Sequence, residues 1–186
     1  MSISLKKGNT IDLSKDHPSL HKIVVGLGWE VPAHHVVDLD VSAFLLTKQG
    51  KMPSDKHFVF YNNLKSPDGA VTHTGDNRTG YGPDDDEVLL VNLNKVDSEV
   101  QEIIIVLSID EAHTKQHHFG MLNNAFLRIY DVEAHKEILR YDVDERNPHH
   151  VSLVFGKLYR VGLAWHFEAV GHGSSSGLQS YISQYS

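Results

Sequence analysis

The chain has 186 residues, of which 40% are hydrophobic and 22% are charged, and its formal net charge is −7 at pH 7. A chain of this length forms one domain with a substantial core. Its acidic balance argues against a nucleic-acid partner, which needs basic side chains at its phosphates. There is no cysteine, which excludes disulfides, thiolate metal sites and a cysteine nucleophile. We find no signal-peptide core and no membrane-spanning run, and therefore expect a cytoplasmic protein.

Most apolar segments are short, rich in β-branched and aromatic residues, and separated by turn-forming residues, which predicts β-strands. The expected strands cover residues 10–13, 22–29, 36–46, 57–61, 88–93, 103–109, 125–130, 138–143, 151–160 and 164–170. This pattern predicts an all-β fold, a sandwich of two antiparallel sheets formed by a single domain over residues 1–186. The segment 103–107, Ile-Ile-Ile-Val-Leu, is apolar on both faces, which indicates a central strand.

A short helix is expected near residue 186. Leu178, Tyr181, Ile182 and Tyr185 follow helical spacing after the Gly/Ser segment 173–177. We expect this helix to cover an edge of the sandwich.

The segment 62–87 interrupts the strand pattern. It reads NNLKSPDGAVTHTGDNRTGYGPDDDE, and at most a short strand at 70–73 divides it. A loop of this length in a compact domain is usually functional or disordered.

Acidic side chains gather in this segment and in one strand before it. Asp38 and Asp40 are two residues apart in a predicted strand, so both carboxylates point to one face. Like charges side by side destabilise a sheet unless a cation neutralises them. Asp76 and Asn77 lie in a glycine-flanked turn, and an acidic run follows Pro83. If these segments converge, their oxygens suit calcium, which takes six to eight oxygen ligands in irregular geometry.

The expected calcium ligands are seven acids and three amides from these segments. They are Asp38, Asp40, Asp76, Asp84, Asp85, Asp86 and Glu87, with Asn62, Asn63 and Asn77. The pattern is not that of an EF-hand, and magnesium is less suited because it demands strict octahedral geometry.

At these residues the chain resembles the TerD family of tellurium-resistance and general stress proteins. The matching stretches are 25–29, 38–46, 58–80, 85–87, 124–126 with Arg128, 140–142, 156–160, Trp165 with Phe167, and 169–171. The match continues in one order to about residue 178. The resemblance implies a β-sandwich that binds calcium at its acidic loops, a bacterial or phage-related stress setting, and partner proteins from the same resistance system.

The resemblance also assigns metal ligands. The family's DLD acids fall on Asp38 and Asp40, its GDN pair on Asp76 and Asn77, and its closing acids on residues 85–87. Asp84 stands where relatives carry a glycine. The family's usual Ile-His-Asp-Ala is Ile-Asp-Glu-Ala at residues 109–112. Here Asp110 either enlarges the metal site or caps a strand.

Three alternatives stay open beside a non-catalytic calcium-binding scaffold or sensor. The first is a calcium-dependent module for anionic membrane lipid, for which Arg78 and Tyr81 are the supporting residues. The second is a metal-dependent hydrolase that uses the acidic cleft. The third is a second metal, zinc, copper or nickel, bound by some of the 14 histidines, although no HExxH motif or regular histidine spacing appears.

Overall fold

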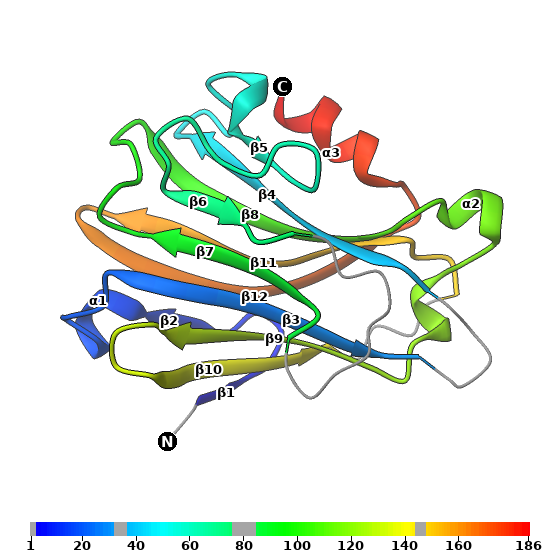
Figure 1. The fold of residues 1–186 in the computed structure, drawn as a ribbon, viewed down its shortest axis with the longest axis horizontal. Coiled ribbons are helices and arrows are strands. Elements are labelled where there is room, and N and C mark those ends of the chain that lie inside the picture. The colour runs from blue at the N-terminus through cyan, green and yellow to red at the C-terminus, as the bar shows by residue number, and fades with distance from the viewer. Residues whose placement is uncertain (1–2, 32–36, 76–84, 144–147) are drawn as a thin grey trace.

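The structure is a computed structural model that describes residues 3–31, 37–75, 85–143 and 148–186, and the statements below concern these residues. Two six-stranded sheets stack on each other (Figure 1). In the β3 sheet the strand order is β1 (Ile3–Leu5), β10 (Lys136–Val143), β9 (Asn124–Asp131), β3 (Lys22–Glu30), β7 (Glu87–Asn92) and β6 (Val71–His73). In the β8 sheet it is β2 (Thr10–Asp12), β12 (Ala164–Ser174), β11 (Ser152–Val161), β8 (Val100–Ile109), β4 (Leu39–Thr47) and β5 (Phe58–Val59).

The predicted sandwich is confirmed, and nearly all strand pairs are antiparallel. The exception is β1, which pairs in parallel with β10 and sets Ile3 opposite Leu139. The next strand, β2, pairs with β12 in the other sheet. The first strands of the chain therefore cross from one sheet to the other.

The main core lies between the sheets and follows from strand alternation. Along β9 the residues Ala125, Leu127 and Ile129 are buried, and the residues between them are partly exposed. Along β3 the buried core residues are Ile23, Val25, Leu27 and Trp29. The intervening residues of both strands therefore lie on the outer face of the β3 sheet.

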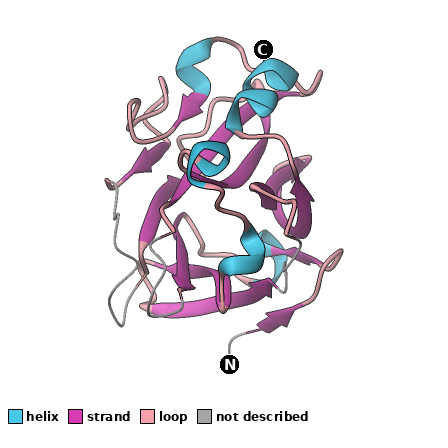
Figure 2. Cartoon of the chain, turned by 90° about the vertical axis from the view of Figure 1, so that its right-hand side faces the viewer, coloured by secondary structure: helices cyan, strands magenta, loops and turns pink. Residues whose placement is uncertain are grey.

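A second apolar cluster lies on the outer face of the β8 sheet. It contains Phe44 and Leu46 of β4, Ile104 and Val106 of β8, and Tyr181 of α3 (Leu178–Tyr185). Helix α3 lies outside the strands at the end where the C-terminus is marked (Figures 1 and 2). This cover explains why β8 is apolar on both faces and central, as predicted.

The position expected for α3 was wrong in one respect, although its residues were predicted correctly. The helix covers the outer face over β4 and β8 and not an edge alone. The physical reason is the large aromatic surface of that face, where the Phe44 and Phe58 rings stack with centroids 4.5 Å apart. Met52 N donates to Tyr185 O at 2.7 Å and fixes the end of the helix.

Short elements account for the other differences from the expected strands. Strand β5 is limited to two residues, because the 3-10 helix η1 (Asp55–His57) precedes it and a turn at 60–63 follows it. The remaining helical turns are α1 (Leu13–Asp16), α2 (Ala112–Lys115) and η2 (Phe119–Met121). Asp12 begins α1 by accepting from Lys15 N at 2.9 Å, an N-cap contact.

Candidate functional site

Asp38 and Asp40 lie at the start of β4 and are buried, with 8% and 9% of their surface exposed. Val37, Leu39 and Val41 point into the core between the sheets, so the two aspartates alternate to the outer face of the β8 sheet. Asp110 N donates to Asp38 O at 2.9 Å, and Asp40 stands opposite Ser108 of β8. The predicted sharing of one face by these two residues thus agrees with the alternation in the structure.

A cavity of about 310 Å³ opens beside Asp40, between α2 and the start of α3. Ser108, Asp110, His113 and Gln179 are among the side chains that line it. Asp110 lies 3.3 Å from Lys115 Nζ, so this acid already has a cationic partner in the protein.

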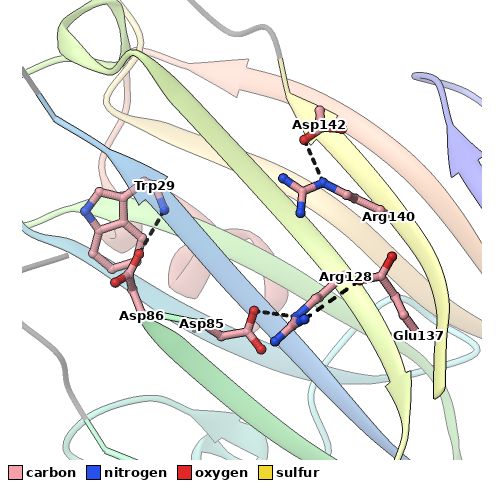
Figure 3. A network of polar contacts seen from close by, with 7 residues as sticks. All are labelled: Trp29, Asp85, Asp86, Arg128, Glu137, Arg140 and Asp142. Atoms are coloured by element: carbon pink, nitrogen blue, oxygen red, sulfur yellow. Dashed lines mark hydrogen bonds and ion pairs between the residues drawn. The ribbon is translucent and has the colours of Figure 1, made fainter. Parts of the chain in front are cut away.

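Asp85 lies on the outer face of the β3 sheet, where Arg128 of β9 meets it (Figure 3). Arg128 Nε donates to Asp85 Oδ1 at 2.7 Å, and Arg128 Nη1 is 3.8 Å from Glu137 Oε2. The Asp85 carboxylate occupies the space that a Cβ atom on Gly26 would fill. A glycine at this position of β3 is therefore what lets the carboxylate lie against the strand.

Asp86, the residue just before β7, extends the pairing between β7 and β3 by one residue. Glu87 is paired with Leu27, and Asp86 N donates to Leu27 O at 2.7 Å. Asp86 Oδ2 then accepts from Trp29 N at 2.9 Å (Figure 3), so a side chain takes the place of a strand partner. Burial raises the pKa of Asp86; the Trp29 hydrogen bond opposes this, and the neighbouring carboxylates of Asp85 and Glu87 add to it.

Glu87 points the other way, into the protein, where it meets His73. Glu87 Oε2 lies 3.0 Å from His73 Nε2, and the two side chains are 0% and 1% exposed. Gly75 N donates to His73 Nδ1 at 3.0 Å, which leaves the ring proton on Nε2, the nitrogen near Glu87. The two side chains therefore form a close polar contact inside the protein.

The two expected amide ligands in the described part of the chain lie in the turn after β5. Asn62 is exposed. Asn63 donates from Nδ2 to Phe58 O at 2.6 Å and to Lys56 O at 3.2 Å, so it stabilises its own turn.

Three of the expected ligands, Asp76, Asn77 and Asp84, lie outside the described residues. Among the residues that are described, no three His, Asp or Glu side chains are grouped closely enough to hold a metal ion. The structure brings Asp38 and Asp40 to one face and separates them from Asp85, which lies on the outer face of the other sheet. Asp85, Asp86 and Glu87 are neighbours in sequence, but their carboxylates contact different parts of the protein.

Several histidines share one cleft. His113, His117, His118 and His149 line a cleft of about 450 Å³ with Pro148 and Ser175. Within the described part of the chain, these histidines do not form a group of three that could hold a metal ion. His34 and His35 lie outside the described part.

Sequence reasoning missed the partners of the acids. Trp29, His73 and Arg128 hold Asp86, Glu87 and Asp85, respectively. All three partners belong to the matching stretches of the family resemblance. The resemblance therefore marked these residues, but it did not indicate which acid each of them contacts.

None of the helices in the described residues is long and apolar enough to cross a membrane. The fold and its acids define an all-β sandwich with buried carboxylates at the starts of β4 and β7.

Comparison with known proteins identifies the family. The TerD domain model matches residues 1–185. The tellurium resistance protein TerD of Serratia marcescens is 46% identical over 187 residues, covering 100% of this chain and 97% of that protein. General stress protein 16U of Bacillus subtilis (strain 168) is 42% identical over 188 residues, covering 100% of this chain and 97% of its own. The chain therefore belongs to the TerD family of tellurium-resistance and general stress proteins.

Solved structures agree on the fold. The crystal structure of a homologue of the telluride resistance protein TerD from Streptomyces coelicolor A3(2) superposes with a TM-score of 0.68 at 21% identity, covering 88% of this chain and 95% of that chain. A crystal structure of a protein of unknown function gives a TM-score of 0.72 at 22% identity, covering 87% of this chain and 94% of that chain. At these identities the likeness concerns the fold alone. The names of the tellurium resistance protein TerD and of general stress protein 16U state no catalytic activity.

Proposed function

We propose that this protein binds calcium at the acids that begin β4 and acts without catalysis, as a scaffold or sensor for other proteins of a stress-resistance system. The observation that carries the proposal is the burial of Asp38 and Asp40, two residues apart, on one face of the sheet. Two carboxylates that share one face of a sheet favour a cation beside them. Carboxylate oxygens are ligands that calcium prefers.

The environment of Asp86 supports the same proposal. Its pKa is raised because burial removes water and because two carboxylates adjoin it. A nearby divalent cation would offset both effects. The two β4 aspartates cannot supply the six to eight oxygens of a calcium ion, so Asp76, Asn77 and Asp84 stay predicted ligands.

The proposed setting comes from the relatives. Their names concern tellurium resistance and general stress, which supports partner proteins of the same system. A calcium-dependent lipid module remains the alternative, but Arg78 and Tyr81 lie outside the described residues and no described feature favours it. Flotation with anionic vesicles, with and without calcium, separates lipid binding from protein binding.

Calorimetric titration of chelator-stripped protein with calcium, magnesium and zinc tests the proposal. We expect calcium-selective binding at about 10⁻⁷–10⁻⁵ M, the range of cytosolic sensors. Asp38→Asn and Asp40→Asn should each weaken it by at least ~10-fold, the loss typical of a disturbed metal site. Asp16→Asn, an exposed acid in α1, changes the charge equally and should leave the affinity near wild type. If calcium gives no heat, or if all three variants bind alike, the β4 aspartates are not ligands.

A further inference from the structure

The end of the acidic segment is held at three points by three consecutive acids. Asp85 meets Arg128 on the outer face of the β3 sheet, and Glu87 meets His73 inside. Between them, Asp86 binds the backbone of β3 at Trp29. A chain whose successive side chains are fixed in different directions has little freedom to rotate at the middle residue.

We infer that Arg128, acting through Asp85, is a positioning residue that fixes the carboxylate of Asp86 for the cation site; this rests on the proposed function. Arg128 Nε donates to Asp85 Oδ1 at 2.7 Å, and the Asp85 side chain is 7% exposed. A charge-assisted hydrogen bond of this length is among the strong ones in proteins. The neighbouring Asp86 uses Oδ2 for Trp29 N, and the described residues give no hydrogen bond to its Oδ1.

The Asp85 site is built into the sheet. Gly26 lacks the Cβ atom that would occupy the position of the Asp85 carboxylate. Arg128 lies opposite Gly26 in the pairing of β3 with β9, so the guanidinium and the bare glycine backbone lie beside the same carboxylate. Figure 3 shows the contact between Arg128 and Asp85. Two strands thus contribute to one carboxylate contact, as expected for an outer-shell contact that orients a ligand.

Two variants remove this contact by different routes. Arg128→Gln removes the cation and its donor. Gly26→Ala changes no charge, but its methyl group must displace the Asp85 carboxylate. If Asp85 acts by position, both variants should weaken calcium binding by about 10-fold or more, the typical cost of losing an outer-shell contact. Arg128→Lys should restore part of the affinity, since it keeps the charge without the planar donor group.

Matched controls lie on the same face. Arg140→Gln removes a guanidinium whose Nε donates to Asp142 Oδ1 at 3.0 Å (Figure 3). The same guanidinium lies over the Phe126 ring. Gly28→Ala adds a methyl group two residues along β3, where it meets the Phe126 ring. Both controls should bind calcium near the wild-type affinity.

The outcomes separate the roles. Loss of calcium affinity in Arg128→Gln and Gly26→Ala, but not in the controls, supports positioning. A gain of affinity in Arg128→Gln, with loss in Asp85→Asn, would make Asp85 a direct ligand that the arginine had been neutralising. Affinities equal to those of the controls would leave Arg128 as an ordinary ion pair and overturn the inference.

Hydrogen exchange of the Trp29 amide tests the positioning in the absence of calcium. This amide donates to Asp86 Oδ2, so it should exchange faster in Arg128→Gln and Gly26→Ala than in Arg140→Gln. Unchanged exchange would overturn the inference whatever the calcium result. If wild-type protein binds no calcium, the proposed function fails, but the exchange rates still show whether Arg128 holds Asp86 in place.

Discussion

His73 and Glu87 form a buried pair at the base of the segment that joins β6 to β7, with Nε2 and Oε2 3.0 Å apart. His73 ends β6 and Glu87 begins β7, so the pair joins both ends of that segment. Removing a partner of a buried polar group costs roughly 1–3 kcal/mol, because the group loses a contact and cannot replace it with water. We expect His73→Ala to lower the free energy of unfolding by this amount in urea denaturation.

Glu87→Gln is the companion experiment. Its amide oxygen can still face the Nε2 proton, so it should cost clearly less than Glu87→Ala. If Glu87→Gln and Glu87→Ala lower the free energy of unfolding equally, the negative charge of Glu87 accounts for the stability, and an oxygen atom at that position alone does not.

Asp68 links two turns and should make stability depend on pH. Ser66 Oγ and Ala70 N donate to its Oδ1 at 2.6 and 2.9 Å, and Asp97 N donates to Oδ2 at 2.9 Å. Burial acts to raise the pKa of Asp68, but these hydrogen bonds together outweigh it and lower the pKa below 3.8. The contribution of Asp68 is therefore present above the unfolded-state pKa of about 3.9 and is lost as the pH falls through the lowered folded-state value.

Asp68→Asn should remove that acid-side dependence and cost about 1–3 kcal/mol at neutral pH, because an amide cannot accept at both positions. Urea unfolding across the acid range checks both effects, with Asp16→Asn as an exposed control. A variant whose stability falls with acid as steeply as the wild type would contradict this assignment.

Tyr185 should give the opposite pH dependence at the alkaline end. Burial first, and then the nearby Tyr181 and Glu102, raise the pKa of Tyr185 to about 12. The unfolded chain ionises at about 10, so the stabilisation is complete below that pH and is lost as the pH rises towards the folded-state value. Alkaline unfolding monitored by phenolate absorbance should lose this component in Tyr185→Phe, and identical curves for both proteins would count against it.

Tyr181 should provide most of the attachment of α3. It is 6% exposed and packs in the cluster that contains Phe44. Tyr181→Ala should cost about 3–5 kcal/mol, as for other large aromatic truncations in cores. Tyr181→Phe should cost at most about 1 kcal/mol, because the Oη contact with Ser152 Oγ is long, at 3.4 Å. Thermal unfolding of the two variants checks the difference, and equal costs would show that the hydroxyl contact outweighs the packing.

Much of the fold was predictable because its cause is local. In β9 an apolar residue stands at every second position, which indicates one buried face. In residues 103–107 of β8 the residues of both faces are apolar, which indicates two buried faces. The helix over 178–185 was predictable from the spacing of its apolar side chains. Strand β1 was not, since three residues that pair with β10 carry too little periodicity of their own.

The candidate site was predictable in composition but not in arrangement. The shared face of Asp38 and Asp40 follows from strand periodicity alone. The separation of Asp85 from Glu87 depends on partners distant in the sequence, Arg128 for one and His73 for the other. Sequence adjacency identifies such acids as a group, but which strand each carboxylate meets is decided by the stacking of the sheets.

The crossing of β1 and β2 between the sheets has a consequence for the order of folding. Ile3 pairs with Leu139, and Ile11 pairs with Phe167, so both pairings close very long loops. The entropy cost of closing these loops is offset only after the distant strands have formed. We infer that the first strands in the sequence are the last to dock. Because each adds only three residues at a sheet edge, they should also be the first to open, and the sandwich should come apart from its earliest residues while β8 and β9 remain paired.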